Sequence, residues 1–233
     1  MNYIDAYWTI ETYAVCGPAT TQRILPDGCM DIIFNKGNDI FRPDQQVALR
    51  SAETYLVGTM TTFSETMHGS DQSLLGMRFK PGCFCAFFPL DLHEITDLST
   101  NFRSHDLRGI VYGSQDLLKD LNLYFLQRLP ADVLATTAVL SDIQNSKGQI
   151  RVAELLRNHA MSERKMERLF KREVGLSIKG MIRLTRFIHT LDAIRSAGPE
   201  RSLSTIAYTH GYYDQAHLCA EVKKYSGFTP SQL

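Results

Sequence analysis

The C-terminal part of the chain repeats itself with a shift of 52 residues. This shift superimposes two favourable N-cap residues, Ser162 and Asp214, and two glycines that follow predicted helices, Gly175 and Gly227. Each copy is predicted to contain a short helix, a tight turn and a second helix that begins at the cap and ends at the glycine. Two helix-turn-helix units in register constrain the fold more than any other feature of the sequence.

A long helix is predicted between the two units, from Ile178 to Ala197, and Gly198-Pro199 ends it. Its ~20 residues would span ~30 Å at ~1.5 Å per residue. Successive major grooves on one face of B-DNA are ~34 Å apart. The spacing therefore suits a chain that inserts both second helices into adjacent major grooves of one duplex.

The formal net charge of zero conceals two halves of opposite sign. Residues 1–130 carry 10 basic and 15 acidic side chains, a net charge of −5, whereas residues 131–233 carry 15 basic and 10 acidic side chains, a net charge of +5. The sequence Leu129-Pro130 separates them. We therefore predict an acidic domain over residues 1–130 and a basic domain over residues 131–233.

The first domain is predicted to be rich in β-strands, because apolar residues alternate with polar ones over residues 30–34 and 75–79. Helical periodicity replaces this alternation over residues 114–129 and continues through the second domain. The expected fold class is thus α+β. It combines an N-terminal β-rich barrel or sandwich with flanking helices and a C-terminal all-α domain of seven helices, in which a long helix joins two helix-turn-helix units.

Several other functions are disfavoured by the sequence. The longest apolar run, Cys83 to Leu90, is too short to span a membrane, and the N-terminus lacks the basic residues of a secretory signal. The odd number of cysteines fits a reduced, cytoplasmic protein. Phosphate-binding loops and nucleophile motifs are missing, and His93-Glu94 lacks the second histidine of a zinc protease. We therefore predict no enzyme activity, no cofactor and no metal.

The segments LFKREVGLSIKGMIRLTRF and IAYTHGYYDQAHLCAEVKKYSGFTPSQL resemble the double helix-turn-helix domain of the AraC/XylS family of bacterial transcription regulators. The segments RILPDGCMDIIF and LLGMRFKPG also resemble a small β-rich sensor domain that is often fused ahead of it. The resemblance implies a regulator that binds double-stranded DNA. It further implies a small-molecule effector, a homodimer and, for an activator, contact with RNA polymerase.

The same resemblance places base-reading positions of the first unit on Arg164, Glu167 and Arg168. In the second unit Ala220 stands where a basic residue is common and Val222 where phenylalanine is usual, so weaker or more shape-dependent readout is expected there. The other predicted DNA-binding residues include the two caps, Ser162 and Asp214. They also include cations expected to contact phosphates or to form a solvated face, which are Lys165, Lys171, Arg172 and Lys224. The last group consists of polar residues of the second unit, Gln215, His217 and Glu221.

Other features leave alternatives open. Asp31 and Arg78 interrupt apolar strands, so they are candidates for orienting an effector, or else form a structural salt bridge or lie on a solvated face. The helix with Leu117, Leu121 and Phe125 belongs to the core or forms a dimer seam. Rival functions are a sensor with a reactive cysteine, at Cys29 or Cys83, and a regulator whose N-terminal half binds a protein.

Overall fold

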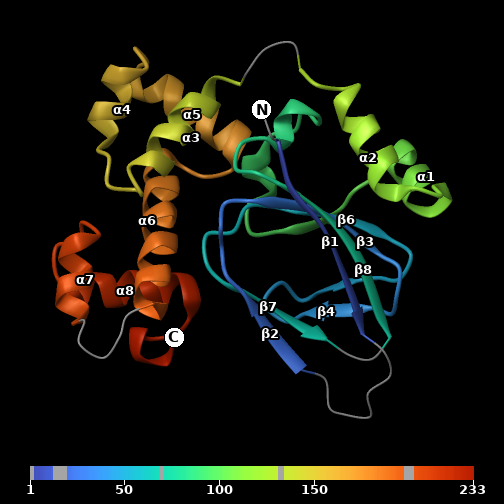
Figure 1. Ribbon diagram of the computed structural model, residues 1–233, viewed down its shortest axis with the longest axis horizontal. Coiled ribbons are helices and arrows are strands. Elements are labelled where there is room, and N and C mark those ends of the chain that lie inside the picture. Colours follow the sequence, from blue (N-terminus) through green and yellow to red (C-terminus); the bar gives the residue numbers. More distant parts are fainter. Residues whose placement is uncertain (1–2, 13–19, 69–70, 131–133, 197–201) are drawn as a thin grey trace.

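The computed structural model describes residues 3–12, 20–68, 71–130, 134–196 and 202–233. Its N-terminal part contains two antiparallel sheets, and its C-terminal part is a layer of helices beside them (Figure 1). The strands are β1 (Ile4–Thr12), β2 (Thr20–Ile24), β3 (Met30–Asn35), β4 (Ile40–Arg42), β5 (Val47–Leu49), β6 (Thr54–Val57), β7 (Ser64–His68), β8 (Gln72–Phe79) and β9 (Ser99–Asn101). The sheet orders are β1-β8-β3-β6-β9 and β2-β7-β4-β5.

The outer face of the five-stranded sheet is covered by helices. Met30, Ile32 and Phe34 of β3 are buried on this face, as the alternation predicts. The covering elements are the 3-10 helices η1 (Phe84–Ala86) and η2 (Leu92–Ile95) and the helices α1 (His105–Gly113) and α2 (Leu117–Leu126). This arrangement confirms the predicted β-rich part with flanking helices. Strand β1, which forms an edge of the sheet, was not predicted from the sequence.

Helix α2 corrects the proposed dimer seam. Leu121 and Phe125 are buried in the core that covers the five-stranded sheet, so neither of them is available to a second chain. The exposed leucines of this helix are Leu118, Leu123 and Leu126. Helical periodicity gave the apolar character of the helix, but two of its sides are apolar, and only packing decided which one is buried.

The described residues of the C-terminal part form helices and the turns between them, and none of these residues lies in a strand. Its elements are α3 (Ala135–Asn145), α4 (Val152–Asn158), α5 (Glu163–Val174), α6 (Ile178–Arg195), α7 (Leu203–Thr209), α8 (Gln215–Ser226) and η3 (Pro230–Gln232). These helices share one apolar core, which includes Phe170, Phe187 and Tyr225. The pairs α4–α5 and α7–α8 are the two helix-turn-helix units, and α6 joins them (Figure 1). The α+β class is confirmed, whereas the boundary between residues 130 and 131 stays a prediction because residues 131–133 lie outside the described ranges.

Within the described residues, no helix is both long enough and apolar enough to cross a membrane.

Candidate nucleic-acid interface

The predicted caps fix both ends of α5 and α8. The side chains of Ser162 and Asp214 accept hydrogen bonds from backbone N–H groups in the first turns of α5 and α8. Gly175 and Gly227 follow the last turns with φ of 82° and 72°, a left-handed conformation that glycine adopts without steric cost. The repeat found in the sequence is therefore a repeat of helix boundaries.

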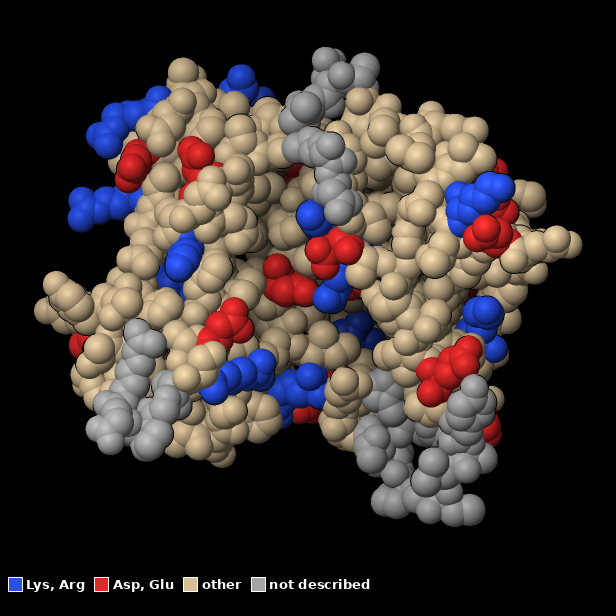
Figure 2. Space-filling model, in the orientation of Figure 1, with Lys and Arg blue, Asp and Glu red and all other residues tan. Residues whose placement is uncertain are grey.

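One side of α5 is a basic surface open to solvent. Met166, Phe170 and Val174 face the core on the other side. The exposed predicted residues of α5 are Arg164, Lys165, Arg168, Lys171 and Arg172, and Glu167 is half-buried between them. Figure 2 shows basic side chains standing out from the molecule over the C-terminal helices. This surface presents the hydrogen-bond donors that recognise guanine edges and phosphates.

Helix α8 presents fewer polar groups than the sequence suggests. Gln215 is exposed, and its Oε1 accepts a hydrogen bond from Ser204 Oγ at 2.9 Å. His217 is half-buried, and its Nδ1 accepts from the backbone N–H of Tyr213 at 3.4 Å. Both side chains are therefore partly engaged within the second unit, while Lys224 is exposed near its end.

Glu221 does not lie on the exposed face that the sequence analysis gave it. Its side chain is only 7% exposed, and its Oε1 lies 3.7 Å from Nε of Arg183 on α6. The carboxylate is turned towards the helix that joins the two units. The burial and this contact disfavour the predicted role of Glu221 in base reading.

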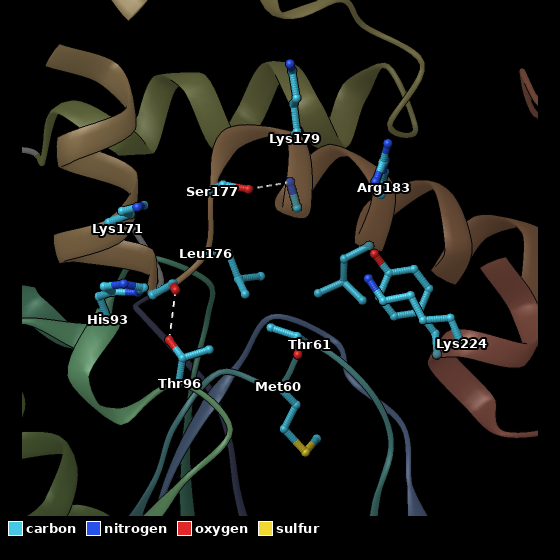
Figure 3. A pocket seen from close by; sticks show the side chains of 14 residues that line it. Met60, Thr61, His93, Thr96, Lys171, Leu176, Ser177, Lys179, Arg183 and Lys224 are labelled. Atoms are coloured by element: carbon cyan, nitrogen blue, oxygen red, sulfur yellow. Dashed lines mark hydrogen bonds between the residues drawn. The ribbon is translucent and has the colours of Figure 1, made fainter. Parts of the chain in front are cut away.

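A basic cavity of about 350 Å³ connects the ends of α5 and α8 (Figure 3). Lys171 of α5 and Lys224 of α8 line it, and Lys179 and Arg183 project from the first turns of α6 between them. None of the described residues that line it is acidic. Lys179 and Arg183 were not among the residues predicted from the sequence, although they stand two and six residues after the cap Ser177 of α6 and are one helical turn apart.

The N-terminal part binds the C-terminal ends of both α5 and α8. Thr59 Oγ1 donates to the carbonyl oxygen of Val174 at 2.7 Å, and Thr96 Oγ1 donates to that of Gly175 at 2.8 Å. At the second helix, Thr62 Oγ1 donates to the carbonyl oxygen of Lys224 at 2.7 Å. These hydroxyls satisfy carbonyls that a helix leaves free at its end. The N-terminal part therefore holds both helices while their outer faces stay exposed.

Arg23 of β2 completes this contact. Its Nη1 donates to the carbonyl oxygen of Ser226 at 3.1 Å, and its Nη2 lies 2.6 Å from Oε1 of Glu65. The guanidinium also lies 4.2 Å from the ring centres of Phe63 and Phe228, in cation–π geometry. Nothing in the local sequence around Arg23 indicated this role, because its partners are far away along the chain.

Asp31 and Arg78 are brought together, and they bond each other. They are directly opposite on β3 and β8, with Arg78 Nη2 3.2 Å from Asp31 Oδ2. Trp8 Nε1 donates to Asp31 Oδ1 at 2.8 Å, and Arg78 Nη1 lies 3.0 Å from Asp27 Oδ2. Of the alternatives left open by the sequence, these contacts favour the structural salt bridge.

Cys29, Cys83 and Cys85 do not have the environment of reactive thiols. Burial raises the pKa of Cys85 to about 12, and it also raises the pKa of Cys29 and Cys83. A nucleophilic cysteine needs the opposite shift, since the thiolate is the reactive form. Cys219 is half-buried on α8, and Cys16 lies outside the described residues. The geometry thus disfavours the rival function of a cysteine-based sensor at Cys29 or Cys83.

This environment gives the first prediction. In a Cys16→Ser/Cys219→Ser variant, the three remaining thiols should react slowly with Ellman's reagent at pH 8, because burial raises the pKa of each thiol and so keeps it protonated. Addition of urea should make all three react rapidly. A thiol that reacts in the folded protein as fast as free cysteine would instead support the sensor.

Two family models match separate parts of the chain. Residues 155–233 match a family described as a helix-turn-helix domain, and residues 1–101 match one described as a domain of unknown function (DUF6597). The HTH-type transcriptional activator RhaR of Yersinia pseudotuberculosis is 29% identical over 93 residues, which cover 40% of this chain and 31% of RhaR. RhaR of Yersinia pestis gives the same values. The match thus spans less than a third of the length of these curated relatives.

Solved structures of ToxT from Vibrio cholerae have a similar fold over nearly the whole chain. One has a TM-score of 0.54 at 11% identity and covers 98% of this chain and 97% of ToxT. Another, bound to (E)-4-(8-methylnaphthalen-1-yl)but-3-enoic acid, has a TM-score of 0.52 at 13% identity and covers 98% of both chains. The fold and the paired helices define a two-part protein with a double helix-turn-helix domain. Residues 155–233 are thus similar to known helix-turn-helix domains, and the fold of the chain is similar to that of ToxT.

Proposed function

We propose that this chain is a sequence-specific DNA-binding transcription regulator and not an enzyme. The observation that carries the proposal is the pair of capped helices, α5 and α8, with exposed outer faces at the two ends of α6. Helix α6 has 18 residues, so it is ~27 Å long, comparable to the distance between successive major grooves. One chain can thus place both helices on one side of a duplex.

The exposed residues of α5 take distinct roles in this proposal. Arg164 and Arg168 read base edges, because arginine donates two hydrogen bonds to guanine O6 and N7. Glu167 accepts from cytosine N4. The remaining cations contact phosphates, and they are Lys165, Lys171 and Arg172 on α5, Lys179 and Arg183 on α6, and Lys223 and Lys224 on α8.

Binding by the full chain should depend steeply on salt. If about six phosphates are neutralised, the affinity for a duplex should fall by about 10³ between 50 and 200 mM salt, because bound counterions are released. Fluorescence anisotropy with a labelled duplex at several salt concentrations measures this slope. A binding constant that does not change with ionic strength would contradict a DNA interface made of these cations.

The effector is proposed to be an organic acid that occupies the basic cavity. Both parts of the chain line this cavity, with Met60, Thr61 and His93 on one side and the cations on the other. A ligand there touches the ends of both reading helices, so it can favour one arrangement of the two parts over another. The ToxT structure with a bound naphthyl butenoic acid shows that a protein of similar fold binds an organic acid. The cavity replaces the Asp31–Arg78 site suggested by the sequence.

A matched pair of compounds tests this part of the proposal. The naphthyl butenoic acid bound by ToxT should raise the melting temperature of the full chain and change the affinity of the chain for DNA. The reason is that the carboxylate of the acid would form charge-assisted hydrogen bonds with the lysines and Arg183 that line the cavity. Its methyl ester has nearly the same apolar surface but no charge, and it should have a much smaller effect. Equal effects of acid and ester would show that the cations of this cavity do not bind the ligand.

A further inference from the structure

Corresponding positions on the outer faces of α5 and α8 are exposed to solvent, but the side chains at these positions differ in chemistry. The shift of 52 residues pairs Arg164 with Ala216 and Arg168 with Ala220. All four residues are exposed. Arg164 and Arg168 are one helical turn apart on α5, and Ala216 and Ala220 are one helical turn apart on α8. The two helices therefore present corresponding faces, and α8 carries methyl groups where α5 carries guanidinium groups.

A third pair of corresponding residues also has a charged side chain on α5 and a small side chain on α8. Glu167 of α5 pairs with Cys219 of α8, and both are half-buried. Ala216, Cys219 and Ala220 form what we call the small face of α8. Among them only the Cys219 thiol carries a polar hydrogen, and it is a weak donor. The centre of α8 cannot recognise base edges with strong hydrogen bonds.

We infer that the small face of α8 recognises thymine by contact with its 5-methyl group. Thymine carries the only methyl group that the four standard bases present in the major groove, and alanine is a side chain that packs against it. Short side chains also let the helix backbone come closer to the bases than arginines do. This inference rests on the proposed function, because it assigns a base to the second reading helix.

Polar groups at both ends of the small face fit this role. Gln215 has its carbonyl oxygen occupied by Ser204, so its amide N–H groups are left for a phosphate or a purine N7. Tyr213, 93% exposed, stands just before the helix, and Lys223 and Lys224 are exposed near its end. These groups can hold the backbone on both sides while the centre packs against methyl groups.

The same geometry disfavours G·C pairs beneath the small face. The exocyclic amine of cytosine and the O6 of guanine would lose water against methyl groups and gain no strong partner. Discrimination then comes from two sources, a favourable contact with thymine and an unpaired polar edge with G·C. We therefore expect A·T pairs at one or two positions of the half-site under α8, with the thymine facing Ala216 or Ala220.

Replacement of thymine by deoxyuridine tests the contact without changing the protein. The best duplex is first selected from random sequences with the full chain, and the half-site whose preference relaxes in Arg168→Ala is assigned to α5. In the other half-site, each contacted thymine changed to deoxyuridine should lower the affinity about fourfold, since the favourable burial of one methyl group is lost. The same change in the half-site of α5 should have a smaller effect.

A second variant follows the correspondence between the helices. Ala220→Arg restores the residue type that α5 has at this position, and it should change one preferred base in the half-site of α8 from thymine to guanine. Ala220 is exposed, so the variant should fold, and circular dichroism checks this. Ala153→Arg, on the exposed face of α4, is a control that adds the same charge and should leave the preferred sequence unchanged.

The possible results separate this inference from the proposed function. If the full chain selects no sequence, the proposed function is wrong. If it selects a sequence with two half-sites, but G·C pairs lie under α8 or deoxyuridine leaves the affinity within twofold at every thymine there, the recognition of thymine by α8 is wrong and the regulator remains. A fourfold loss confined to the half-site of α8 supports the inference.

Discussion

Replacement of Arg168 by alanine is expected to weaken binding to the preferred duplex by ~1–3 kcal/mol, which is about 5- to 150-fold, and to relax the choice of one base pair. Arg168 is exposed near the middle of α5, on the side opposite Met166 and Phe170. The loss of two hydrogen bonds to a guanine accounts for the effect. Anisotropy titrations with the selected duplex and with its single-base variants measure both parts of it.

Lys171→Ala is the matched control, because Lys171 lies on the same helix but is proposed to contact a phosphate. It should lower the affinity for selected and random duplexes by the same factor and reduce the dependence on salt. If Arg168→Ala also lowered both affinities equally, Arg168 would be a phosphate contact. The residue that reads the base would then have to be sought at Arg164 or Glu167.

Arg78→Met is expected to lower the free energy of unfolding by about 3 kcal/mol. Removal of one partner from a buried ion pair leaves the other charge without compensation, and this typically costs ~3–5 kcal/mol. Asp31 is 8% exposed and would retain only the indole N–H of Trp8. The lower end of the range applies because the Arg78 side chain itself is 29% exposed. Equilibrium unfolding in urea measures the change.

The double variant Arg78→Met/Asp31→Leu should recover most of this loss, since no buried charge remains. The unpaired Trp8 indole would still cost about 1 kcal/mol. Recovery would show that Asp31 and Arg78 support the sheet. If Arg78→Met instead left the stability unchanged but abolished the effect of the naphthyl butenoic acid, Asp31 and Arg78 would be candidates for the effector site.

The local elements of the C-terminal part could be predicted because their signals lie within a few residues of each other. A serine or aspartate bonds the N–H three residues ahead, and a glycine adopts the left-handed conformation at the end of the same helix. Both helix-turn-helix units and their spacing follow from such signals, and so does the basic face of α5. The caps Ser162 and Asp214 are therefore located by sequence alone.

The orientation of the Glu221 carboxylate in the second unit could not be predicted from such local signals. Glu221 has the spacing of an exposed helical residue, yet the helix packs so that its carboxylate faces Arg183 of α6. Helical periodicity fixes which residues share a face, but not which of two polar sides meets a neighbouring helix. Leu121 and Phe125 are uncertain in the sequence for the same reason, and the sheet beneath them decides their burial.

The sequence by itself determined the class of fold, the bounds of α5 and α8 and the residue types on each helix, because helix caps, periodicity and charge act over short distances. Only the tertiary structure decided that Asp31 and Arg78 neutralise each other, since the register of β3 and β8 places them opposite. It also decided that Arg23 and three threonines bind the C-terminal ends of α5 and α8. These contacts join residues 79 to 203 positions apart, and no local pattern encodes such a pairing.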